Sequence, residues 1–335
     1  MRVAAPLEDF RISAKPAIVV QMSMKSARLW VVCLLSFVCA AQQPFRVQVN
    51  LVNVGFSVRD SRGGLVTDLV QDDFEVVEDG VPQKISFFAR SADVPLNLAL
   101  VVDVSGSQES FVKPHHKDLE TFLKNVLTAR DRAFLLCFGN GLHLASDFSA
   151  SPGGLVESLR AFEKGREVFP ILGPHEYRIL GTAFYDAVYY AITERLASAE
   201  RGRRALILFS DGEDNSSAHH MLDAIETAQT NNVLIFAVRY TEVKRGILNA
   251  RNKYGISVMA RLAQETGGAD FDAREKGLAD NFRQIGEQLR SSYELAYQTT
   301  NPVSDGTFHK IAIRVKREGM VARAKTGYFA RMDSR

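Results

Sequence analysis

Short apolar runs alternate with segments of helical pattern through the middle of the chain, and this alternation limits the fold more than any other feature. The apolar runs lie at residues 96–102, 133–138, 205–209 and 233–238, and the helical patterns at 116–128, 153–162, 183–199, 217–230, 257–266 and 277–291. Strands that lack polar alternation are buried on both faces, as in parallel sheets covered by helices. The pattern therefore predicts an α/β domain over residues 94–290, with a doubly wound, mainly parallel sheet and helices on both faces.

The segments on either side of this region have the character of β-strands. In residues 45–92, Val52, Val54, Phe56 and Val58 alternate with other residues, and Asp79-Gly80 is a hairpin turn signal. Short alternating runs return in residues 291–331. Because the first segment is small for a core of its own, we expect both segments to pack together into one β-sandwich-like domain around the inserted α/β domain.

Residues 1–41 have the features of an N-terminal extension followed by a secretory signal peptide. A short basic stretch precedes the apolar run 29–38, and small residues follow it. The run is shorter than the roughly 20 residues that span a bilayer. We therefore expect a signal peptide at about 24–41, a secreted, periplasmic or cell-envelope location, and membrane contact only if this segment stays uncleaved. Cys33 and Cys39 would leave with it, and Cys137, in an apolar run, would remain as a buried thiol.

The charge balance argues against a nucleic-acid partner. The chain has 41 Lys and Arg against 39 Asp and Glu, a formal net charge of +2. The basic cluster that includes Arg203 and Arg204 lies just before an apolar run, where we expect a solvated loop at the amino-terminal edge of the sheet. Zinc-protease, nucleophile-elbow and phosphate-loop motifs are absent from the sequence, so we expect no enzyme.

Oxygen-bearing residues stand at the ends of three predicted elements. Asp103, Ser105 and Ser107 follow the first apolar run, Thr182 precedes a helix, and Asp211 follows the run 205–209. The carboxyl ends of parallel strands are where such sheets bind ligands. Carboxylates and hydroxyls suit hard cations such as Mg²⁺, Mn²⁺ or Ca²⁺, whereas Zn²⁺ favours His and Cys. The sequence therefore predicts a divalent-cation site. Glu213 and Asp214 are read as solvated loop residues beside it, and His309 as isolated.

With Asp-x-Ser-x-Ser, a later Thr and a later Asp, the chain resembles the von Willebrand factor type A domain and its metal-ion-dependent adhesion site. The residues that match are Asp103, Ser105, Ser107, Thr182 and Asp211, and the resemblance covers about residues 94–290. It implies a bound Mg²⁺, with Mn²⁺ or Ca²⁺ as alternatives, and metal-dependent protein binding. The whole chain is also similar to secreted proteins of acidobacteria that carry this domain.

Together these observations predict a secreted or envelope-associated, adhesion-type binding module. Its divalent cation would capture an acidic residue of a protein partner. Two alternatives stay open: a structural scaffold whose metal only stabilises the fold, and an unrecognised hydrolase with Ser105 as its nucleophile.

Overall fold

The computed structural model describes residues 51–90, 94–106, 108, 116–165, 167–174, 181–200, 202–241, 248–274, 277–301 and 306–330. Residues Val49–Arg335 cluster into one compact unit. The predicted signal peptide and Ser107 lie outside the described residues. None of the described helices is both long enough and apolar enough to cross a membrane.

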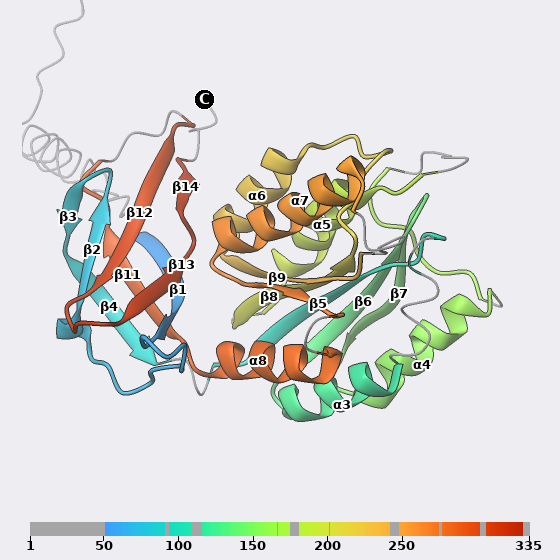
Figure 1. Cartoon of the computed structure of the whole chain (residues 1–335), viewed down its shortest axis with the longest axis horizontal. Helices are drawn as coiled ribbons and strands as arrows, with labels where there is room; N and C mark the ends of the chain where they lie inside the picture. The colour runs from blue at the N-terminus through green and yellow to red at the C-terminus, as the bar shows by residue number, and fades with distance from the viewer. Residues whose placement is uncertain are drawn as a thin grey trace, which may run out of the picture. The chain divides into compact units, whose positions relative to one another are not determined.

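A six-stranded sheet forms the centre of the α/β part, as Figure 1 shows. Its strands, in spatial order, are β10 (Asp270–Asp272), β9 (Val233–Arg239), β8 (Arg203–Ser210), β5 (Leu96–Asp103), β6 (Arg132–Phe138) and β7 (Leu142–Ser149). All neighbours pair in parallel except β6 and β7, which are antiparallel. The chain first builds outward from β5 to β6 and β7 and then continues with β8 on the other side. This change of direction at β5 is where ligands bind in doubly wound sheets.

Helices cover both faces of this sheet, and each face has its own hydrophobic core (Figure 1). One face packs against α3 (His116–Val126), α4 (Pro152–Glu163) and α8 (Leu278–Arg290), and the other against α5 (Phe184–Tyr190), the π-helix η5 (Ala191–Leu196), α6 (Met221–Thr230) and α7 (Ala250–Thr266). Strand β5 shows the cause: Leu98 and Leu100 enter the first core, and Ala99 and Val101 the second. The expected fold class is confirmed.

The N- and C-terminal segments form two four-stranded antiparallel sheets. The first has the order β13 (Val321–Ala324), β1 (Leu51–Arg59), β11 (Tyr293–Gln298), β4 (Ile85–Arg90), and the second β14 (Gly327–Phe329), β12 (Phe308–Val315), β2 (Phe74–Glu78), β3 (Val81–Gln83); a short 3-10 turn, η2 (Gln71–Asp73), precedes β2. Each sheet pairs a strand from before the α/β part with one from after it, β1 with β11 and β2 with β12. This confirms that the flanking segments form one sandwich.

Aromatic rings fill the space between the two sandwich sheets. The rings of Phe56 and Phe74 meet edge to face with centroids 5.0 Å apart, and Tyr293 stacks on Phe56 and on Phe88. The Tyr293 hydroxyl donates to the Val66 carbonyl (2.9 Å) and accepts from the Leu69 amide (3.1 Å). A residue from the tail therefore orders a loop of the leading segment.

Three parts of the α/β region differ from expectation, and the first is the short edge strand β10, which lies outside all the predicted apolar runs. The antiparallel edge strand β7 carries polar residues along its length, so it lacks the continuous apolar run that marks the other strands. Helix α7 begins at Ala250, seven residues before the expected start at 257, with Asn249 as its N-cap. Cys137 is buried within β6, as expected, and burial raises the pKa of its thiol.

The role of β5 as the central strand gives a stability prediction. We expect Leu100→Ala to lower the free energy of unfolding by about 2–5 kcal/mol, because it leaves a cavity in a closely packed core. Leu222 lies on α6 and is 58% exposed, so it serves as the matched control. Leu222→Ala should change the free energy of unfolding by less than about 0.5 kcal/mol. Urea unfolding followed by circular dichroism measures both. Equal effects would contradict the central position of β5.

Candidate metal centre

The carboxyl ends of three neighbouring strands bring the predicted site residues to one edge of the sheet. Asp103 ends β5, and Asp211 follows directly after β8, the strand paired beside β5. The amide of Val104 donates to the Phe138 carbonyl at the end of β6 (2.9 Å), and the amide of Ala183 donates to the carbonyl of Gly139 (2.9 Å). Thr182, next to Ala183, is thereby held at the same edge.

Asp103 is fully buried, yet its carboxylate is surrounded by donors. Oδ1 accepts from the Ser105 amide at 2.9 Å, and Oδ2 accepts from the Ser210 hydroxyl at 2.7 Å. Burial raises the pKa of Asp103 to about 6, the hydrogen bonds from Ser105 and Ser210 oppose this rise, and the negative charge of Asp211 adds to it. Two neighbouring carboxylates with little access to water are the arrangement that a bound cation stabilises.

Gln108 ties Asp211 to the loop that follows β5. Its side-chain Nε2 donates to Asp211 Oδ2 at 3.0 Å and to the Tyr240 carbonyl at 3.3 Å, and the side chain is almost completely buried. The other oxygen, Oδ1, accepts from the Glu213 amide at 3.1 Å. Asp211 is thus fixed in position by donors from two loops.

Two glycines allow the close approach of the segments that carry these residues. Gly212 has a φ of +80°, and a Cβ there would lie 2.4 Å from the carbonyl oxygen of Gly255 on α7. Gly181 has a φ of +144°, and a Cβ there would lie 2.7 Å from the Ser216 side chain. The Asp211 turn therefore packs directly on the backbone of α7, and the Thr182 segment packs on the loop after β8.

The described residues fit a hard divalent cation in their chemistry. Asp103 and Asp211 offer carboxylate oxygens and Ser105 and Thr182 offer hydroxyl oxygens, which is the donor set that Mg²⁺ and Ca²⁺ prefer. Thr182 is partly exposed and is anchored through its backbone, since its amide donates to Asn215 Oδ1 at 2.7 Å. The assignment of Ser107 stays a prediction because that residue is not among those described.

Ser210 and Gln108 are parts of this site that sequence reasoning missed. Ser210 immediately precedes Asp211, and its place at the end of β8, next to β5, could have indicated a contact with Asp103. Gln108 follows the Asp-x-Ser-x-Ser motif directly, but nothing in the sequence links it to Asp211, which is 103 positions away. Both contacts depend on the folded chain bringing separate loops together.

The expectation of a solvated loop at Glu213 and Asp214 is wrong. Asp214 accepts a hydrogen bond from the Phe184 amide at 2.9 Å and so binds the first turn of α5. Glu213 pairs with Arg251 at 2.7 Å, and burial and the charge of Asp211 raise its pKa while Arg251 opposes the rise. Free amides at a helix start attract carboxylates, which explains the place of Asp214.

A second group of possible ligands lies in the sandwich, where Glu78, Asp79 and His309 have ligand atoms within 4.8 Å of one another. His309, expected to be isolated, is buried with Nδ1 at 2.7 Å from Asp79 Oδ2. The buried Glu78 accepts from the hydroxyls of Tyr297 (2.6 Å) and Thr299 (2.5 Å). These contacts form a polar network, with Glu78 and His309 buried and Asp79 exposed, that joins the strands of the sandwich.

Of three comparisons with known proteins, one finds similar proteins. A scan against protein-family models finds no match, and a search of curated proteins finds none either. Among solved structures it resembles proximal thread matrix protein 1 from the mussel byssus, with 16% identity and a TM-score of 0.44 over 64% of this chain and 51% of that one. The chain thus spans about half the length of that protein, of which another structure is described as having a zinc-occupied MIDAS motif.

Two further matches are von Willebrand type A domains by description. The vWF domain of the type V pili tip protein Mfa5 from Porphyromonas gingivalis has 12% identity and a TM-score of 0.42, over 58% of this chain and 94% of that one. The SpRpn10 VWA domain has 12% identity and a TM-score of 0.38, over 57% and 95%. These matches name the domain type that the sequence resembles. The fold itself is established by the strand order and the two helical layers described above.

The network around Glu78 gives a second stability prediction. Glu78→Gln replaces a carboxylate that accepts from buried hydroxyls with an amide that has one acceptor oxygen, and we expect it to lower the free energy of unfolding by about 1–3 kcal/mol. Glu75, on the same strand, is partly exposed and pairs with Arg314, so Glu75→Gln should change stability little. Denaturant unfolding of the two variants checks this, and a harmless Glu78→Gln would contradict a structural role.

Proposed function

We propose that this protein is a non-enzymatic binding module that uses a divalent cation to capture an acidic side chain of a protein partner. The observation that carries the proposal is the pair of buried carboxylates, Asp103 and Asp211, at the ends of two adjacent strands. Both are kept in place by donors from the chain, and partly exposed hydroxyl-bearing residues lie at the same edge. Mg²⁺ is the first choice of ion, with Mn²⁺ or Ca²⁺ as alternatives.

The site residues would have two roles, since the aspartates would supply negative charge and the hydroxyl-bearing residues would supply neutral ligand oxygens. Asp103 and Asp211 supply negative charge from beneath the site, and Ser105, Ser107 and Thr182 would supply neutral hydroxyl oxygens. When bound, the ion supplies a positive charge that the neutral hydroxyls do not cancel and that attracts a carboxylate from outside. Ser210 and Gln108 hold the two aspartates and so position the site without facing the partner.

The cellular location is part of the same proposal. A secreted, periplasmic or cell-envelope protein would meet protein partners outside the cytoplasm, and the signal-like segment at 24–41 supports this location. The alternatives of a metal-stabilised scaffold or a hydrolase make different predictions, which the two experiments below separate.

The first experiment measures the metal. We expect Mg²⁺ to bind the full chain in isothermal titration calorimetry and to raise its melting temperature, because a ligand that binds only the folded state stabilises it. Asp103→Ala should abolish the binding heat and the shift. Asp280→Ala, which removes an exposed carboxylate on α8, is the matched control and should leave both intact. Undiminished Mg²⁺ binding by folded Asp103→Ala would refute the site.

The second experiment looks for the partner. Cross-linked capture from a cell-envelope fraction, with and without EDTA, should recover a protein that is lost when EDTA is present and when Asp103→Ala replaces the wild-type chain. Changing the contacting Asp or Glu of that protein to Asn or Gln should abolish capture. A metal-dependent melting shift with no metal-dependent partner would favour the scaffold, and turnover that Ser105→Ala abolishes would favour the hydrolase.

A further inference from the structure

A cavity of about 550 Å³ lies at the opposite edge of the six-stranded sheet from the metal centre. It adjoins the amino ends of β8 and β9, and its lining includes Arg203, Arg204, Gln229, Asn232, Glu294 and Lys325. Strand β8 runs from Arg203 at this edge to Ser210 beside Asp211, and its 8 residues cover roughly 25 Å. The cavity and the metal centre are therefore separate sites.

Lys325 brings an ammonium group into this cavity, and no carboxylate of the described residues pairs with it. The residue is only 7% exposed, and its Nζ donates to the Gln229 carbonyl at 3.1 Å and to Asn232 Oδ1 at 2.6 Å. Neither acceptor carries a charge. Burial lowers the pKa of Lys325 to about 8. Because an ammonium buried without a counter-charge is costly, the position favours a negative partner from outside the chain.

Two arginines add to the positive charge of the lining. Arg203 is held by a hydrogen bond to the Leu289 carbonyl at 2.9 Å, and burial lowers its pKa to about 10, which Glu294 opposes. Arg204 donates from NH1 to the Asn231 carbonyl at 3.3 Å and from NH2 to the carbonyls of Ala197 and Ala199 at 3.3 and 3.4 Å. Its Nε is buried with no hydrogen-bond partner in the part of the chain that the structure describes. The described lining residues include three cationic side chains and one carboxylate, Glu294.

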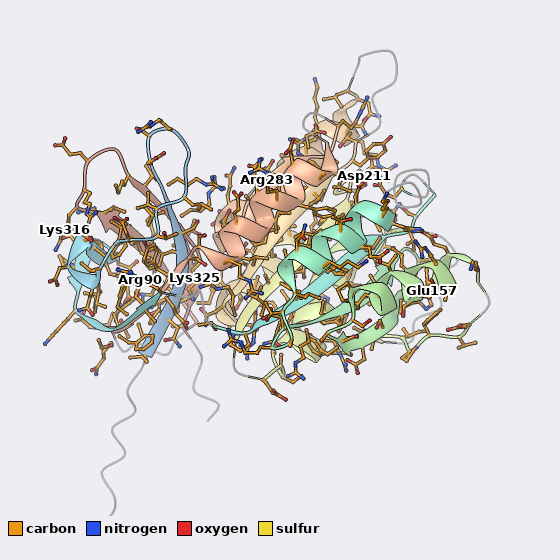
Figure 2. The ribbon with its side chains drawn as sticks, turned by 90° about the horizontal axis from the view of Figure 1, so that it is seen from below. Arg90, Glu157, Asp211, Arg283, Lys316 and Lys325 are labelled. Carbon is orange, nitrogen blue, oxygen red and sulfur yellow. The ribbon has the colours of Figure 1, made fainter. Side chains whose placement is uncertain are left out.

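The sequence prediction placed the basic residues at this edge correctly, but the expectation that they are solvated is wrong. Arg203 and Arg204 do lie at the amino-terminal edge of the sheet, as expected, but both are partly buried and line a cavity. Lys325 lines the same cavity and belongs to the connection between β13 and β14. The residue after it, Thr326, donates its backbone amide to the Glu265 carbonyl on α7 at 3.1 Å. Figure 2 labels Lys325 and Asp211.

We propose that this cavity binds a small anionic molecule through its phosphate or carboxylate group, with Lys325, Arg203 and Arg204 as the recognising residues. The donors suit oxyanions, since arginine and lysine are the side chains that bind phosphate and carboxylate oxygens most strongly. The volume lies within the range of sites for small organic ligands, so there is room beyond the anionic group. Asn232 lines the same space and supplies an amide for orientation.

The purely structural alternative is that Lys325 only fastens the β13–β14 connection to the last turn of α6, where Gln229 lies. That role needs the two hydrogen bonds of Lys325 but does not use the positive charge of Arg203 and Arg204 or the open volume beside them. The two readings differ in a measurable way, because only the ligand site predicts anion binding that depends on Lys325.

The test titrates the full chain with sulfate, inorganic phosphate and acetate, with chloride at equal ionic strength as the reference. Calorimetry and melting temperature should both detect binding of at least one oxyanion. Lys325→Met should weaken that binding at least tenfold. Lys316→Met is the matched control, because Lys316 is an exposed lysine that donates to the Asp72 carbonyl, and it should leave the affinity within twofold. Figure 2 labels both lysines.

A pH series on the wild-type chain keeps the proposal testable if Lys325→Met does not fold. Sulfate keeps its charge from pH 6.5 to 9.5, whereas Lys325 loses its proton as the pH rises through its lowered pKa of about 8. The other charged groups of the lining are Glu294, Arg203 and Arg204. Affinity should therefore fall as the pH rises. Binding of phosphate but not acetate assigns a phosphoryl ligand, and the reverse assigns a carboxylate. No oxyanion binding, or binding that neither Lys325→Met nor pH changes, would overturn the proposal.

Discussion

The burial of β5 on both faces is the constraint on which the rest of the α/β part depends. Strand β5 has a hydrophobic core on each side. Its last residue, Asp103, lies between these cores at the edge of the sheet, and its carboxylate is fully buried. Such a charge is tolerated only where donors surround it. Ser210 and Ser105 provide them, and so the charged site and the fold of its surroundings are fixed together.

The sandwich depends on a different constraint, which is the pairing of segments that are distant in sequence. Strands β1 and β2 have β11 and β12 as their partners, so the leading segment completes its sheets only after the α/β part has been made. Tyr293 and the Glu78 network are the contacts that hold this pairing inside the sandwich. Lys325, which follows strand β13 of the sandwich, contacts Gln229 and Asn232 at the amino-terminal edge of the central sheet.

Local patterns were sufficient for the fold class and for the placement of Asp103, Thr182 and Asp211 at one edge of the sheet. The apolar runs predicted β5, β6, β8 and β9, and the motif spacing predicted that Asp103 and Asp211 meet at one edge. The edge strands β7 and β10 were missed because β7 mixes apolar with polar residues and β10 is only 3 residues long, so neither has a continuous apolar run. The partners of His309 and of Lys325 were missed because they lie on distant segments, and periodicity carries no information about such contacts.

The central claim is that the carboxyl edge of the sheet holds a cation, and crystals grown with Mn²⁺ test it most directly. Anomalous scattering locates the ion without any assumption about its ligands. We predict a peak beside the hydroxyls of Ser105 and Thr182, above Asp103 and Asp211. A peak at Glu78 and His309 with none at this edge, or no ordered Mn²⁺ at all, would contradict it.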